Sequence, residues 1–91
     1  MNNNSMFIGH KPLMEYVRAL VTHFTTKGAS AMSIHARGKL ISRAVDVAQI
    51  SCTRFLTNVE IKNVKIDSED FQDEEGKQVR VSNIEIMLEK K

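Results

Sequence analysis

Two short basic segments carry the residues of this 91-residue chain that are best suited to chemistry. Residues 34–46 read Ile-His-Ala-Arg-Gly-Lys-Leu-Ile-Ser-Arg-Ala-Val-Asp, which predicts the end of a strand, a tight turn at the glycine and the start of a helix. A helix N-terminus already carries partial positive charge and free N–H groups, so cations there are unfavourable unless an anion binds. Phosphate is the anion that this arrangement favours. The polar side chains at this turn are Arg37, Lys39, Ser42 and Arg43.

The second basic segment, residues 9–12, reads Gly-His-Lys-Pro and repeats the design with His10 and Lys11. Basic residues in a loop are commonly just solvated surface, and a lone Arg-Gly-Lys would be explained that way. Two such turns are harder to ascribe to chance, and both should open helices on the same side of a sheet. Lysine contacts phosphate as a point charge and arginine as a fork. Because neither turn shows a recognition-helix pattern, we expect backbone contacts with little sequence preference.

Charge is unevenly distributed along the chain. The net charge is only +2, but residues 1–65 hold nine Lys and Arg against three Asp and Glu, a balance of +6. Residues 66–91 hold four against eight, a balance of −4. An asymmetry of this kind suggests one surface that faces a polyanion.

Length and composition indicate one small folded domain. The apolar fraction of 42% is typical of a globular protein, and a domain this short would gain stability from a second copy. We therefore expect a single domain over residues 1–91, with residues 1–5 flexible. The single Cys52 excludes an internal disulfide and is expected to be a small buried residue. Without a secretory segment or a long apolar run, the chain is expected to be cytoplasmic, with no membrane partner.

The apolar spacing predicts the element order β-α-β-α-β-β. Strands are expected at residues 6–8, 31–36, 59–66 and 79–88, helices at 13–24 and 40–55, and an acidic loop at 69–78. The fold class is therefore α+β, a two-layer sandwich of a four-stranded mixed sheet with two helices on one face and a long hairpin.

Three predicted elements are apolar on two sides. Leu40, Val47 and Ile50 lie off the expected core stripe of the second helix, whose members are Ile41, Ala44, Val45, Ala48, Cys52 and Phe55. These off-stripe residues would contact either a partner or the edge of the same sheet. The last two strands change phase at residues 62–63 and 82–83, which indicates bulges or apolar contacts on both faces. Such two-faced strands suit a surface shared with another subunit.

Catalysis and metal binding have no support in the sequence. His10, His23 and His35 lack metal-ligand spacing, and no Ser/His/Asp set or phosphate-binding glycine loop is present. We therefore expect no enzyme activity, no metal and no cofactor.

The two basic segments resemble the Alba proteins, small archaeal chromatin proteins. Residues 9–12 are similar to the family's Gly-Lys-Lys-Pro turn, and residues 35–46 to its motif Lys-Ala-Arg-Gly-Arg-Ala-Ile-Ser-Lys-Ala-Val-Asp. Residues 54–56 and 81–86 also match in order and spacing, so the resemblance covers residues 6–91. It implies a homodimer that binds double-stranded DNA, and RNA, with little sequence preference and coats and compacts the chromosome.

The resemblance also implies roles for single residues. The first lysine of the family's turn is its acetylation site; here His10 replaces it, so Lys11 is the remaining candidate. Family dimers associate side by side through the end of the second helix, which assigns that contact to Phe55. The family's hairpin reaches along the minor groove, but the tip here is acidic. Only Lys77 and Arg80, expected at the base of this arm, remain as DNA contacts there.

Two alternatives to a chromosomal protein stay open at this point. The chain could be an RNA-binding subunit of an RNA-processing particle, or a protein-binding adaptor whose acidic loop is the active surface. Salt-sensitive binding to random duplex would exclude the adaptor. The expected nucleic-acid contacts are His10, Lys11, Arg37, Lys39, Ser42, Arg43, Lys77 and Arg80.

Overall fold

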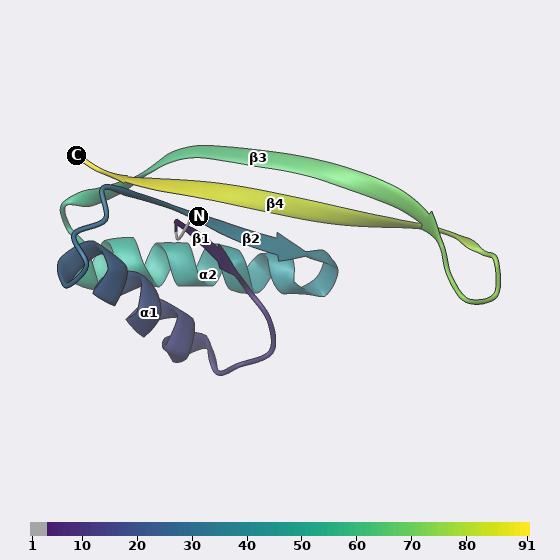
Figure 1. Ribbon diagram of the computed structural model, residues 1–91, viewed down its shortest axis with the longest axis horizontal. Helices are drawn as coiled ribbons and strands as arrows, with labels where there is room; N and C mark the ends of the chain where they lie inside the picture. The colour runs from purple at the N-terminus through teal and green to yellow at the C-terminus, as the bar shows by residue number, and fades with distance from the viewer. Residues whose placement is uncertain (1–3) are drawn as a thin grey trace.

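The computed structural model, which describes residues 4–91, has two layers: a four-stranded sheet and two helices that cover one of its faces (Figure 1). The strand order is β1-β2-β4-β3; β1 runs parallel to β2 and the other pairs are antiparallel. This arrangement confirms the predicted α+β class. The elements are β1 (Ser5–Phe7), α1 (Leu13–Thr25), β2 (Ala31–Arg37), the short 3₁₀ helix η1 (Gly38–Leu40), α2 (Ile41–Ile50), its π-helical extension η2 (Ser51–Phe55), β3 (Val59–Gln72) and β4 (Gln78–Lys90).

Residues 4 and 5 already take part in the sheet. Residues 1–3 of the expected flexible segment lie outside the described residues, but Ser5 already belongs to β1. The backbone N–H of Ser33 donates to the Asn4 carbonyl at 2.7 Å, so pairing between β1 and β2 begins at residue 4.

The core lies between the helices and the sheet. Helix α1 contributes the face that its spacing predicts, and strand β2 alternates as predicted, with Ser33 and His35 half-buried on the other face. We call the sheet face opposite the helices the open face. The buried members from α1 and β2 are Tyr16, Val17, Leu20, Phe24, Met32, Ile34 and Ala36.

The buried face of α2 differs from the predicted stripe. Val47 is fully buried and Leu40 packs against the core, so these off-stripe residues contact their own sheet. Val45, which was expected in the core, is 39% exposed instead. The prediction was wrong because the helix is apolar on two sides, and periodicity alone does not say which side the sheet covers.

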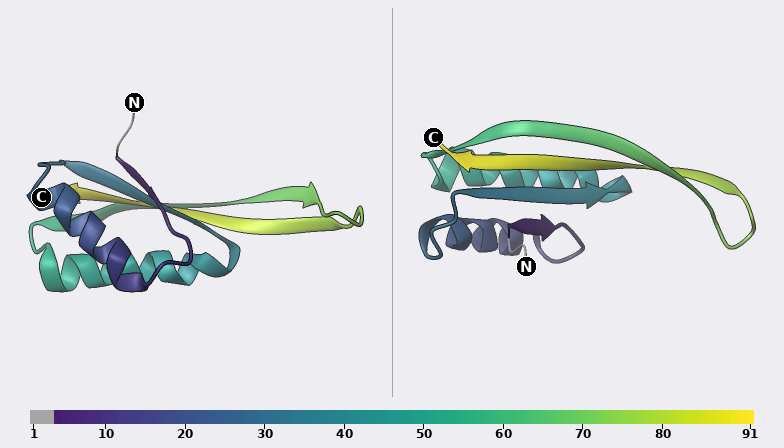
Figure 2. Two further views of the ribbon diagram at one scale, coloured as in Figure 1. Left: turned by 60° about the horizontal axis from the view of Figure 1, so that its bottom comes forward. Right: turned by 45° about the horizontal axis from the view of Figure 1, so that its top comes forward.

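Strands β3 and β4 form an arm that projects beyond both helices (Figures 1 and 2). The expected loop at residues 69–78 is wrong, because the strands continue to Gln72 and resume at Gln78. The turn is shorter and is held by Asp73, whose carboxylate accepts hydrogen bonds from the N–H groups of Glu75 and Lys77, both at 2.9 Å. The arm gives the molecule its long axis of 46 Å.

The two predicted phase changes have different origins. At residues 62–63 the register of β3 shifts between Ile61 and Asn63, which confirms a bulge. At residues 82–83 the pairing of β4 continues without a shift. The apolar residues of β4 therefore lie on both faces of the sheet, as the second alternative proposed.

The hydroxyl of Tyr16 holds the connection between β1 and α1. Its oxygen accepts hydrogen bonds from the backbone N–H groups of Gly9, at 2.8 Å, and Lys11, at 3.3 Å. A Cβ on Gly9 would lie 3.2 Å from this oxygen, so glycine permits the close approach. Pro12 precedes the helix as its N-cap residue rather than occupying the predicted first helical position.

We expect Tyr16→Phe to lower the free energy of unfolding by about 1–2 kcal/mol, because two partly buried N–H groups lose their acceptor. Urea denaturation at a fixed protein concentration measures the change. Thr22→Val is the matched control, since it removes an exposed hydroxyl that bonds only within its own helix, and it should stay within about 0.5 kcal/mol of wild type. Equal effects of the two changes would contradict the role given to Tyr16.

Candidate nucleic-acid interface

The turn between β1 and α1, residues 8–12, presents its basic side chains to solvent. Ile8 is buried and its N–H donates to the His35 carbonyl at 2.9 Å, which fixes the start of the turn. His10 and Lys11 follow and are both exposed. Because the Tyr16 hydroxyl accepts hydrogen bonds from the backbone of Gly9 and Lys11, the backbone that carries the His10 and Lys11 side chains is fixed in position.

The turn between β2 and α2 is the second basic turn. Gly38 has φ = 56°, the left-handed conformation that the sequence predicts for this position. Arg37 and Lys39 on either side are exposed, and so is Ser42 in the first turn of α2. Neither η1 nor α2 has an acidic residue in its first turn or a side-chain cap. The free N–H groups there therefore have no anionic partner among the described side chains.

Arg43 joins the two basic turns. Its guanidinium Nη2 donates to the backbone carbonyl of Lys11, 32 residues earlier in the chain. The side chain is half-buried, and its Nε has no hydrogen-bond partner among the described residues. Arg43 was predicted as a phosphate contact, but its guanidinium points at the neighbouring turn. This hydrogen bond ties the turn of Lys11 to the first turn of α2, the helix that follows Arg37 and Lys39.

The cations of the arm are placed differently from the prediction. Lys77 lies in the tight turn and Arg80 pairs with Asp70 three residues from it, so both are near the tip and not at the base. Arg80 Nε lies 3.0 Å from Asp70 Oδ1, and this hydrogen bond raises the pKa of Arg80. The prediction failed because the strands are longer than the acidic composition indicates. The guanidinium of Arg80 is therefore committed to an acid of its own hairpin.

Phe55 and Cys52 lie in η2, at the end of α2 far from the arm tip (Figure 1). Phe55 is 51% exposed, although its spacing also placed it in the core stripe. Cys52 is partly buried, and this burial raises the pKa of its thiol. A raised pKa disfavours the reactive thiolate, in keeping with a packing role.

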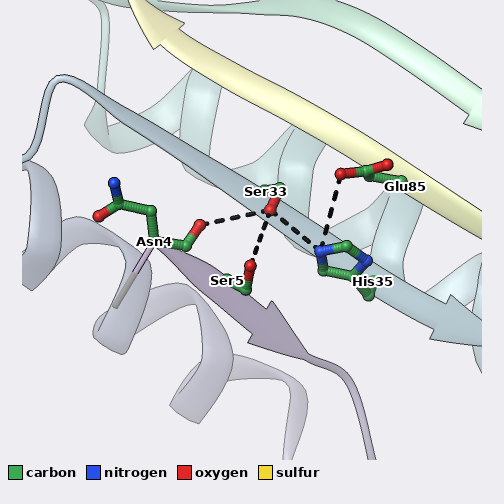
Figure 3. A network of polar contacts seen from close by, with 5 residues as sticks. All are labelled: Asn4, Ser5, Ser33, His35 and Glu85. Atoms are coloured by element: carbon green, nitrogen blue, oxygen red, sulfur yellow. Dashed lines mark hydrogen bonds and ion pairs between the residues drawn. The ribbon is translucent and has the colours of Figure 1, made fainter. Parts of the chain in front are cut away.

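A polar network on the open face joins β1, β2 and β4 (Figure 3). Ser33 Oγ lies 3.2 Å from Ser5 Oγ and 3.0 Å from His35 Nε2, and Glu85 Oε2 lies 3.8 Å from the same His35 nitrogen. A hydrolytic relay needs the serine and the carboxylate on opposite ring nitrogens. Both contacts use Nε2, so this network positions the imidazole and does not form a triad.

Sequence reasoning missed three residues that shape this surface. Tyr16 was read as a core residue, Arg43 as a free cation, and Phe7 as part of a short apolar strand. Phe7 is 73% exposed on the open face, where its ring stacks on His35. Only Phe7 carries a signal in the sequence: it lies one residue before buried Ile8, and strand alternation places such neighbours on opposite faces.

Residues 4–91 contain neither a cluster of metal ligands nor a helix suited to a membrane. Within them, no three His, Cys, Asp or Glu side chains gather closely enough to hold a metal ion. None of their helices combines the length and hydrophobicity that a membrane span requires.

Comparison with known proteins agrees with this geometry. The Alba family model matches residues 4–68. DNA/RNA-binding protein Alba 1 of Archaeoglobus fulgidus is 52% identical over 91 residues, covering 100% of both chains. DNA/RNA-binding protein Alba of Methanocella arvoryzae is 48% identical, covering 97% of this chain and 91% of that one. The solved structure of Alba from Thermoplasma volcanium superposes with a TM-score of 0.87 at 44% identity, covering 96% of this chain and 100% of the other. The chain therefore belongs to the Alba family.

Proposed function

We propose that the chain binds double-stranded DNA, and RNA, through phosphate contacts made by its two basic turns. The observation that carries the proposal is the hydrogen bond from Arg43 to the Lys11 carbonyl, which ties the turn of exposed Lys11 to the helix that follows exposed Arg37 and Lys39. The relatives in Archaeoglobus fulgidus and Methanocella arvoryzae are named DNA/RNA-binding proteins, and the family is not one of enzymes.

The start of α2 adds donors to these cations. Neither η1, which begins one residue before Lys39, nor α2 has a side-chain cap, and the hydroxyl of Ser42 is exposed there. Cations, backbone N–H groups and a hydroxyl are the donors that position a protein on a phosphate backbone without reading bases. His10 lies beside Lys11 and adds charge only when it is protonated.

In the cell, the protein would lie in the cytoplasm on the chromosome. There it would coat and compact the chromosomal DNA. Lys11 is exposed and would lose its charge on acetylation, so modification there would weaken binding. Lys77 and Arg80 are weaker candidates for contacts than their charges suggest, because acids surround both on the arm and Arg80 is already paired.

A homodimer is the second part of the proposal, and an apolar flank supports it. Ile61, Val64 and Ile66 of the edge strand β3 lie opposite Leu88, Ile86 and Ile84 of β4, so they share the face that carries the helices. The helices leave them uncovered: they are 37%, 49% and 76% exposed.

Val45 of α2 is 39% exposed, and a hollow lined by Ile41 and Ile66 continues the surface. A contiguous apolar patch on an edge strand favours association. We call Val45, Ile61, Val64 and Ile66 the apolar flank.

Phe55 supports a further association of dimers. It is an exposed aromatic ring at the opposite end of α2 from the basic turns, so contact through it would leave the turns free.

The proposed phosphate contacts predict how DNA affinity depends on salt concentration. Three exposed cations in each protomer, Lys11, Arg37 and Lys39, give about six phosphate contacts per dimer. The logarithm of the binding constant for random duplex should therefore fall with the logarithm of salt concentration with a slope of about −5. Lys39→Gln should make the slope shallower by about 2, measured by fluorescence anisotropy. Lys27→Gln, the same change at an exposed lysine beyond the far end of α1, should leave it unchanged. A wild-type slope near zero would refute the proposal.

Arg43→Gln separates positioning from direct contact. We expect this variant to bind duplex more weakly with an unchanged salt slope. In wild type the guanidinium donates to the Lys11 carbonyl, so it contacts no phosphate and its loss changes no counterion release. The slope is measured as for Lys39→Gln, which serves as the reference for loss of a phosphate contact. If Arg43→Gln flattens the slope as much as Lys39→Gln does, Arg43 contacts phosphate after all.

The apolar flank predicts the oligomeric state. Wild type should be a dimer at micromolar concentration by light scattering, and Ile66→Asp should shift it toward monomer, because a carboxylate would be buried without a partner. Phe71→Asp is the matched control: Phe71 is 43% exposed on the same strand but faces the other way. A dimer that survives Ile66→Asp and dissociates with Phe71→Asp would place the interface elsewhere.

A further inference from the structure

The open face of the sheet holds a hollow of about 440 Å³, most of whose lining residues have no part in the proposed phosphate contacts. Phe7 and His35 line one side of it, and Lys65 and Asp67 of β3 line the other. Arg37, a cation of the second basic turn, also lines the hollow, so the hollow adjoins the proposed phosphate-binding surface. A nucleic acid held at the basic turns therefore has this hollow within reach.

Phe7 gives the hollow an aromatic surface that is fixed in place. The ring centroids of Phe7 and His35 lie 4.8 Å apart with planes inclined by 21°, a stacked pair. Contacts of His35 Nε2 with Ser33 Oγ and Glu85 hold the imidazole (Figure 3). Phe7 nevertheless stays 73% exposed, a larger exposure than that of Phe55 or Phe71. Aromatic rings displayed on a rigid sheet are platforms on which unpaired bases stack.

The charges around the hollow favour a base over a phosphate inside it. Asp67, Glu69 and Glu85 all line it and would repel a phosphate, whereas their oxygens can accept hydrogen bonds from the amino group of a base. Arg37 and Lys65 lie at its sides and suit the phosphates before and after that base. Arg37 pairs with Glu69 only at 3.8 Å and with both side chains more than half exposed, and such surface pairs are weak enough to exchange for phosphate.

We propose that this hollow binds one unpaired nucleobase that carries an amino group, packed against the Phe7–His35 pair, from a single-stranded or looped segment. The proposal rests on the proposed function, because the basic turns supply the phosphate contacts that bring the strand to the sheet. A paired base within a duplex is stacked and hydrogen-bonded to its partner, so it does not enter. The site therefore adds affinity for unpaired nucleic acid and none for duplex.

The test compares Phe7→Leu with wild type on two probes, a short oligocytidylate and a random DNA duplex, by fluorescence anisotropy. Loss of one stacked base should weaken oligocytidylate binding by about 5- to 100-fold and leave duplex binding unchanged. The duplex measurement also reports that the variant is folded. Phe71→Leu is the matched control, because it removes another exposed phenyl ring outside the hollow, and it should alter neither affinity. Wild type should also bind oligocytidylate more tightly than oligouridylate, because uracil lacks the amino group.

Each contrary result overturns the inference in a recognisable way. If Phe7→Leu leaves oligocytidylate binding intact, no base stacks there. If it weakens both probes equally, the ring acts through the fold of the neighbouring turn. Equal affinity for the two oligonucleotides would overturn the recognition of an amino group. Duplex binding with a steep salt slope but no binding of single strands would refute the hollow while leaving the proposed function intact.

Discussion

The position of the first basic turn depends on the hydrogen-bond partners of the short connection between β1 and α1. Buried or partly buried backbone N–H groups must have acceptors, and the connection from β1 to α1 is too short to supply its own. Tyr16 provides one oxygen for two of these groups, and the missing Cβ of Gly9 lets that oxygen approach. Arg43 then takes the Lys11 carbonyl from the other helix. The first basic turn is thus held by one residue from each helix, so the packing of the helices on the sheet sets its geometry.

Two of the acidic residues of the arm, Asp70 and Asp73, have a structural explanation that does not require a protein partner. Asp73 accepts the two N–H groups that close the turn, and Asp70 pairs across the strands with Arg80. These carboxylates supply hydrogen-bond acceptors and an ion-pair partner to groups of the hairpin that lie beyond the helices. This weakens the adaptor alternative, which needed the acids to be unexplained. The same pairing removes Arg80 from the cations available to phosphate, so the proposed phosphate contacts rest mainly on the two turns.

The sequence predicts the environment of a residue well when its partners are close in the sequence, and poorly when they are distant. The spacing in residues 13–24 predicts the buried face of α1 correctly, because that helix has one apolar side. In α2 the apolar side chains lie on two sides, so the pattern could not assign Val45 to the surface and Val47 to the core. Asp70 reads as a loop residue until Arg80 is seen opposite it. Arg43 shows its charge in the sequence, but its partner, the Lys11 carbonyl, is 32 residues away and carries no side-chain signal.

Strand geometry explains how one short element serves both faces. Successive residues of β1 and its extension point to opposite sides, so Ile8 enters the core while Phe7 stays on the open face. The chain then turns at Gly9 and exposes Lys11 only a few residues later. Phe7 and Lys11, the proposed base and phosphate contacts, therefore lie on either side of Ile8 in the sequence, and the hydrogen bond of Ile8 N–H to the His35 carbonyl fixes the backbone between them. Side chains carried on a paired strand hold their geometry better than side chains on a loop. For this reason base and backbone contacts on the two sides of β1 can act on one bound strand together.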